Sequence, residues 1–162
     1  MTIAVGEALP QTTLFEMTAD GPKSVPSAEV LGVGTVALFA VPGAFTPTCH
    51  MKHMPSYVEH AAALREKGAD AVVCLTVNDP FVADAWAEQT GAKAAGIRVI
   101  ADPAAEMVKA MGLDFDGAVV GLGPRAQRFS MVVKDGKVAA LNVEDAPSDM
   151  GVTSAGSLLA SL

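Results

Sequence analysis

The sequence is poor in charged residues, and the few that it has are mostly acidic. Charged residues make up 18% of its 162 positions, and 18 acidic against 11 basic residues give a formal net charge of −7. No basic patch stands out, so nucleic acid and anionic membrane surfaces are not expected partners. Long apolar runs are also missing, because stretches such as 35–41 are far too short to span a bilayer.

A signal peptide and a disulfide framework are absent as well. The first ten residues, MTIAVGEALP, lack a basic segment followed by a long apolar run, so we expect a cytoplasmic protein. Two cysteines, Cys49 and Cys74, are too few for a disulfide scaffold, and the lack of C-x-x-C disfavours a disulfide oxidoreductase. What the chain does have is 51% hydrophobic residues, enough for a single domain over 1–162.

Hydrophobic patterning predicts strands that alternate with helices, followed by a hairpin. Strands are expected at 12–18, 34–41, 69–77 and 97–102, a turn at 20–22, and helices at 27–31, 56–68, 81–91, 103–112 and 154–162. The Asp-Gly pair in KDGK (134–137) should join hairpin strands at 128–133 and 138–144. This order predicts an α/β fold in which α-helices flank a central mixed β-sheet.

One predicted strand runs directly into VPGAFTPTCHMKH (41–53), which places Cys49 in the first turn of a predicted helix. Thr46 or Thr48 could cap that helix, and Pro55 should break or kink it before it resumes. Sites on sheets of this kind lie beyond the carboxyl ends of the strands, where this segment stands. Its position therefore favours a functional role for Cys49.

The segment around Cys49 could assemble a reactive thiol. A thiol is a nucleophile only as the thiolate, and the free N–H groups of a helix N-terminus favour that charge. Thr46 could offer a hydroxyl to the same site, and Pro42 could form a rigid wall. A cation from elsewhere would complete the arrangement, and either Arg125 or Arg128 could supply it.

Two other interpretations of these residues are open. A lone cysteine is often a small buried residue, which is the expectation for Cys74 in the middle of AVVCLTV. Cys49, His50 and His53 could instead bind zinc or copper. Those three positions do not share one helix face and no second ligand cluster follows, so we expect no metal site.

Several blocks of the sequence resemble the peroxiredoxins. P-x-x-x-T-x-x-C, here Pro42, Thr46 and Cys49, is their active-site signature. The type-5 branch (type II, atypical two-Cys) is resembled further, in the same order, by His53 with Pro55, by VNDPFV (77–82), by Trp86, by RFSMVVKDG (128–136) and by ALNVE (140–144). The resemblance covers nearly the whole chain.

This resemblance implies a thioredoxin-like fold and a thiol peroxidase that needs no metal or other cofactor. Cys49 would attack hydrogen peroxide or an alkyl hydroperoxide and become a sulfenic acid. Thr46 would hydrogen-bond the peroxide, Pro42 would shield the site from water, and Arg128 would stabilise the developing charge. Of the two arginines, only Arg128 lies in the matching R-F-S-M block.

The backbone N–H groups of Thr48 and Cys49, together with Phe45, are expected to contact the peroxide. Phe45, Pro80 and Phe81 are also candidate contacts of a homodimer, as the resemblance implies. A peroxide sensor without fast recycling is an alternative function, because it would use the same sulfenic acid.

The chain departs from the family at the position of a resolving cysteine. Some members carry that cysteine near the C-terminus in a G-L-T-C block, where this chain has GVTS with Ser154. Cys74 is not expected to replace it, since a residue in mid-strand moves little. We therefore expect no resolving cysteine and an external reductant: glutathione or a glutaredoxin first, thioredoxin second. The expected role is antioxidant defence.

Overall fold

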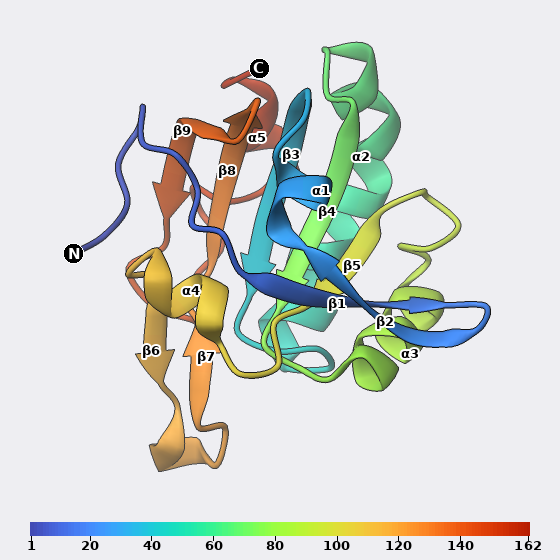
Figure 1. The fold of residues 1–162 in the computed structure, drawn as a ribbon, viewed down its shortest axis with the longest axis vertical. Coiled ribbons are helices and arrows are strands. Elements are labelled where there is room, and N and C mark those ends of the chain that lie inside the picture. Colours follow the sequence, from blue (N-terminus) through green and yellow to red (C-terminus); the bar gives the residue numbers. More distant parts are fainter.

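A computed structural model describes all of residues 1–162, and a seven-stranded sheet in the order β2-β1-β5-β4-β3-β8-β9 forms its centre (Figure 1). The strands are β1 (Thr13–Thr18), β2 (Gly21–Pro26), β3 (Thr35–Val41), β4 (Ala71–Thr76), β5 (Arg98–Ala101), β6 (Asp114–Asp116), β7 (Pro124–Ala126), β8 (Phe129–Lys134) and β9 (Lys137–Val143). The helices are α1 (Ser27–Leu31), the π-helix η1 (Cys49–His53), α2 (Met54–Glu66), α3 (Pro80–Thr90), α4 (Glu106–Ala110), the 3-10 helix η2 (Ala118–Val120) and α5 (Ala155–Leu159).

The sheet is mixed, as the order of the predicted elements requires. β3 pairs in parallel with β4 and antiparallel with β8, and β4 pairs in parallel with β5. The β8–β9 hairpin turns at Asp135 and Gly136, whose φ angles of 48° and 79° fit the expected Asp-Gly turn. The predicted α/β fold with a central mixed sheet is therefore confirmed.

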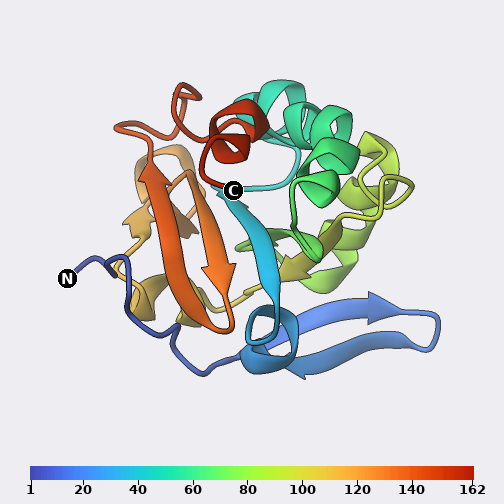
Figure 2. The same ribbon diagram turned by 90° about the horizontal axis from the view of Figure 1, so that it is seen from above.

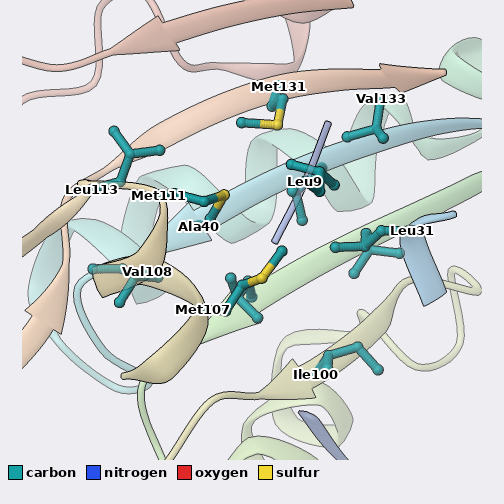
Figure 3. Packing of buried hydrophobic residues seen from close by; sticks show 14 of the residues in the cluster. Leu9, Leu31, Ala40, Ile100, Met107, Val108, Met111, Leu113, Met131 and Val133 are labelled. Carbon is teal, nitrogen blue, oxygen red and sulfur yellow. The ribbon is translucent and has the colours of Figure 1, made fainter. Parts of the chain in front are cut away.

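The core has one layer on each face of the sheet, and β3 contributes to both. Its alternate residues Leu38 and Ala40 belong to the layer with α1 and α4 (Figure 3), whereas Phe39 belongs to the layer with α2, α3 and α5. Figure 2 shows α2 and α5 together on that second face. None of the helices is both long and apolar enough to cross a membrane.

Some elements differ from the sequence-based expectations. The patterns do not predict β2, β6, β7 or η2, and the expected turn at 20–22 lies instead at 19–20, with β2 starting at Gly21. β2 carries prolines at both ends of GPKSVP, which suits only an edge strand. The helix expected at 103–112 is reduced to Glu106–Ala110, because Ala105 has a left-handed φ of 58°.

The helix that starts in the Cys49 segment is widened rather than broken before Pro55. Its first turn begins at Pro47, and the Met54 N–H donates to the Cys49 carbonyl in the π-helical spacing of η1. Thr48 stands at the N-cap position of η1 but its side chain makes no capping bond, and the Thr46 hydroxyl donates to the Gly43 carbonyl at 2.7 Å instead. A π-turn is common at functional sites.

Candidate active site

The loop that follows β3 is held against the end of β4. The Ala44 N–H donates to Asn78 Oδ1 at 2.9 Å, and the Thr76 hydroxyl donates to the same oxygen at 2.6 Å. Asn78 therefore fixes the loop that leads to Cys49. Asn78 has no predicted role, although it stands in the VNDPFV block (77–82) and directly follows a predicted strand.

Cys49 is buried at the start of η1, and its sulfur accepts a hydrogen bond from Arg128. Arg128 Nη2 lies 3.0 Å from Cys49 Sγ. Arg128 is only 2% exposed and forms no ion pair with a carboxylate. A buried cation needs a compensating anion, and the Cys49 thiolate is the group placed to provide it.

The guanidinium of Arg128 is fixed by further bonds. Its Nη1 donates to His53 Nδ1 at 2.8 Å, and its Nε and Nη2 donate to the Pro147 carbonyl at 3.1 and 2.9 Å. Arg125, the other candidate cation, lies against the loop instead and donates to the Pro42 carbonyl at 3.3 Å. Of the two arginines, only Arg128 contacts the sulfur.

Beside Cys49, a pocket of about 260 Å³ brings together most of the predicted site residues. Pro42, Thr46, Thr48 and Arg128 line it, and Phe115, Val120, Leu122, Pro47, Pro147 and Ser148 complete the wall. The Thr46 hydroxyl gives its proton to Gly43, so its oxygen can accept a second hydrogen bond from a bound molecule.

Of the three predicted peroxide contacts, the two backbone N–H groups are free to bind a ligand, whereas Phe45 lies outside the pocket. The N–H groups of Thr48 and Cys49 donate to no acceptor in the protein, as is usual in the first turn of a helix, and are available to a ligand. Phe45 does not line the pocket. It is 45% exposed and stacks on His50 with ring centroids 5.8 Å apart.

The two histidines of the segment point to partners other than a metal. His50 Nδ1 accepts from Trp86 Nε1 at 3.0 Å, and both ring nitrogens of His53 have partners in the protein. Burial, and next the charge of Arg128, lowers the pKa of His53 to about 3, so the ring is neutral at physiological pH. The considered Cys49–His50–His53 ligand set does not converge.

Cys74 lies in the middle of β4 and is fully buried. Burial raises the pKa of its thiol, so the thiol is the protonated and unreactive form. Ser154, at the position considered for a resolving cysteine, is the N-cap of α5 and accepts from the Ser157 N–H at 3.2 Å. Its side chain therefore has a structural role in the helix.

Comparisons of the sequence with known proteins point to one family. A family model described as Redoxin matches residues 4–159. Peroxiredoxin-2B of Arabidopsis thaliana is 40% identical over 161 residues, which cover 99% of this chain and 98% of that protein. The chain belongs to the peroxiredoxin family. Peroxiredoxin-2E-2, chloroplastic, of Oryza sativa subsp. japonica is 44% identical over 148 residues, which cover 89% of this chain and 66% of that protein.

A solved structure agrees with the sequence comparison. Reduced Prx3 of Vibrio vulnificus in complex with H2O2 superposes with a TM-score of 0.92 and 42% identity, covering 99% of each chain. The thioredoxin-like fold is thereby confirmed, and the plant relatives place the chain in the type II branch of the peroxiredoxins, which are thiol peroxidases. The chain spans about two thirds of the length of some curated relatives, 66% and 65% in two of them.

Proposed function

We propose that this peroxiredoxin reduces hydrogen peroxide and alkyl hydroperoxides at Cys49. The thiolate attacks one peroxide oxygen, an S–O bond forms as the O–O bond breaks, and Cys49 becomes a sulfenic acid. The leaving alkoxide or hydroxide takes up a proton and departs as alcohol or water. The observation that carries this proposal is the buried Arg128 guanidinium, which pairs with no carboxylate and donates to the Cys49 sulfur at 3.0 Å.

The other predicted residues fit roles around that step. The Thr46 oxygen and the free N–H groups of Thr48 and Cys49 are available to hold the peroxide, and Pro42 walls the pocket. The two N–H groups and the Arg128 guanidinium are the donors available where negative charge moves from sulfur to oxygen. Donors oriented in advance toward such charge are a large source of catalysis.

The pocket supports both classes of peroxide. Its volume of about 260 Å³ exceeds what hydrogen peroxide occupies, and Phe115, Val120 and Leu122 add an apolar wall that an alkyl group can contact. A hydrogen peroxide complex is known for the 42% identical Prx3 of Vibrio vulnificus. The same pocket is thus proposed for hydrogen peroxide and alkyl hydroperoxides.

The reductant is proposed to come from outside the chain. Ser154 cannot form a disulfide, and Cys74 is fully buried within the sheet. Glutathione or a glutaredoxin is the first choice and thioredoxin the second. The whole chain 1–162 is proposed to form one domain with a cytoplasmic location.

A homodimer is also part of the proposal. Phe45 and Phe81 are 45% and 64% exposed, and Pro80 starts the helix that carries Phe81. Large exposed aromatic side chains near a site commonly mark an interface. Sedimentation equilibrium at micromolar concentration should show a dimer, which a Phe45→Asp, Phe81→Asp double variant should convert to monomer; a wild-type monomer would remove this part of the proposal.

The peroxidase proposal is tested by rapid mixing. Reduced protein is mixed with one equivalent of hydrogen peroxide, and sulfenic acid on Cys49 is trapped with dimedone and followed by intact mass. Oxidation far faster than that of free cysteine, lost in Cys49→Ser and kept in Cys74→Ser, supports the proposal. A rate equal to free cysteine contradicts it, and fast oxidation without turnover by any thiol reductant would favour the sensor.

A further inference from the structure

On the buried side of the active site, a run of hydrogen bonds leads from Cys49 through Arg128 and His53 to Thr153, in the C-terminal part of the chain. Arg128, which donates to Cys49, also donates to His53 Nδ1 at 2.8 Å. The other ring nitrogen, His53 Nε2, lies 3.0 Å from the carbonyl oxygen of Thr153. All four residues are at most 2% exposed, so the run is shielded from water.

Glu144 holds the far end of this run. Its Oε2 accepts from the Thr153 N–H at 2.8 Å, the Thr153 hydroxyl at 2.6 Å and the Val152 N–H at 2.9 Å. Partial burial alone would raise the pKa of Glu144, but these hydrogen bonds outweigh it and lower the pKa, so the side chain is a carboxylate at neutral pH. Three donors on one oxygen fix the backbone at Thr153, and the Tyr57 hydroxyl, which donates to the Thr153 carbonyl at 2.9 Å, helps to fix the direction of that carbonyl.

The Thr153 carbonyl and the Arg128 guanidinium require the same tautomer of His53. A carbonyl only accepts, so Nε2 is protonated and donates to it, which leaves the Nδ1 lone pair for Arg128. The other tautomer would direct an N–H at the guanidinium, and Arg128 would have to turn away. The position of Thr153 therefore supports the orientation of Arg128 toward the sulfur, together with the Pro147 carbonyl that Arg128 also contacts.

We propose that Glu144 is a positioning residue for the peroxidatic thiolate. By placing the Thr153 carbonyl, it selects the Nε2–H tautomer of His53, and that tautomer keeps Arg128 turned toward Cys49. The Glu144 side chain bonds only to Val152 and Thr153 and not to the sulfur, while its backbone N–H donates to the Arg128 carbonyl at 3.0 Å, a bond that every side-chain variant keeps. The inference rests on the proposed peroxidase reaction and extends it to a residue outside the reacting groups.

The neighbouring Asp145 offers a matched control. It carries the same charge one position further along, but it is exposed and its side chain makes no hydrogen bond within the chain. Glu144→Gln is the conservative variant, because its amide oxygen can still accept from the two N–H groups while the charge is lost. Glu144→Ala removes the acceptor altogether. Together with Asp145→Ala, these two variants separate the placement of Thr153 by hydrogen bonds from the effect of the negative charge.

The first readout is the His53 tautomer, seen in long-range ¹H–¹⁵N NMR spectra of the histidine rings. His50→Gln and His60→Gln variants assign the three rings. Wild type, Asp145→Ala and Glu144→Gln should all show His53 protonated at Nε2 only. Glu144→Ala should lose that pattern and show a mixture of tautomers. Retention of the pure Nε2–H form in Glu144→Ala would overturn the proposal.

The second readout is the rate at which hydrogen peroxide oxidises Cys49, measured over a range of pH. We expect Glu144→Ala to slow it by roughly tenfold, with a changed pH profile, because a misdirected Arg128 stabilises the thiolate less. Asp145→Ala should match wild type and Glu144→Gln should recover most of the rate. A Glu144→Gln variant as slow as Glu144→Ala would show that charge, not placement, is what matters.

The test still decides if Glu144→Ala does not fold, or if Cys49 proves unreactive. If Glu144→Ala fails to fold, Thr153→Val removes only the hydroxyl donor to Glu144 and should shift the tautomer and the rate in the same direction, by less; no shift would overturn the proposal. If wild-type Cys49 reacts no faster than free cysteine, the proposed peroxidase function fails. The NMR spectra still report whether Glu144 sets the His53 tautomer.

Discussion

Arg128 Nη2 lies 3.0 Å from Cys49 Sγ, and the Arg128 guanidinium, though buried, is paired with no carboxylate. The two residues are 79 positions apart, one at the start of η1 and the other just before β8. A charged pair inside the protein is weak evidence of stability, because desolvation offsets much of the attraction. Its value here is chemical, since it supplies a cation at the atom that reacts.

Replacement of Arg128 by lysine should slow the oxidation of Cys49 by roughly 100-fold. Lysine keeps the charge but cannot bond Cys49, His53 and the Pro147 carbonyl at once, because it lacks the planar fork of arginine. Stopped-flow fluorescence can follow the reaction, since the single Trp86 bonds to His50 next to the reacting cysteine.

Arg65→Lys is the control for the Arg128 variant, because Arg65 donates to the Ala95 carbonyl outside the pocket. That variant should oxidise at the wild-type rate. Equal rates for Arg128→Lys and Arg65→Lys would show that charge alone, without the geometry of the guanidinium, is enough.

Thr46→Val should slow oxidation by roughly 10-fold to 100-fold, whereas Thr46→Ser should stay close to wild type. Valine has the same shape but removes the hydroxyl, which both holds the Gly43 carbonyl at 2.7 Å and offers its oxygen to the peroxide. Measurement of Cys49 oxidation against peroxide concentration separates the two variants. If serine is as slow as valine, the methyl group and not the hydroxyl is the important part of Thr46.

The main elements of the fold could be predicted because local signals agree with tertiary structure. The apolar run of β3 is buried on both faces, and the Asp-Gly pair forms the hairpin turn at Asp135 and Gly136. The β6–β7 hairpin could not be predicted, since its strands are only three residues long and carry no periodic pattern. Such short strands depend on their neighbours rather than on propensity.

The residues of the site that lie close together in the chain could be predicted. The contacts between distant segments could not. Cys49, Thr46 and Pro42 come from one loop, so their spacing alone brings them together. The sequence predicts for His53 only a place in a family motif with Pro55 or a metal site, although its spacing of four residues from Cys49 places both on one helix face. Its bond to Arg128 depends on how β8 packs against η1, which no local pattern contains.

Cys74→Ser should leave peroxidase turnover with glutathione and glutaredoxin unchanged. Cys74 is fully buried in β4, and burial raises its pKa, so it is neither mobile nor ionised enough to resolve a sulfenic acid. Steady-state turnover of the variant against wild type checks this, with Cys49→Ser as the inactive control. Loss of turnover with normal oxidation of Cys49 would make Cys74 a resolving cysteine.

Acid should destabilise the fold through His53. Its pKa is about 3 in the folded protein against an ordinary value of 6.5, chiefly because it is buried and next because Arg128 lies beside it. Between these values the unfolded chain binds the proton first, so stability is fully present above about pH 6.5 and is lost as the pH falls toward 3. The loss is on the order of 5 kcal/mol over that range.

Urea unfolding at several pH values measures this effect by comparison with His53→Asn. Asparagine does not titrate and can still accept from Arg128, so the free-energy gap between wild type and variant should shrink as the pH falls below 6.5. His60→Gln is the control for the loss of a histidine that does not contact Arg128, because His60 bonds only to the Ser56 carbonyl in its own helix. A His53→Asn gap that does not change between pH 7 and pH 4 would mean that the neutral, buried ring is not what makes the fold sensitive to acid.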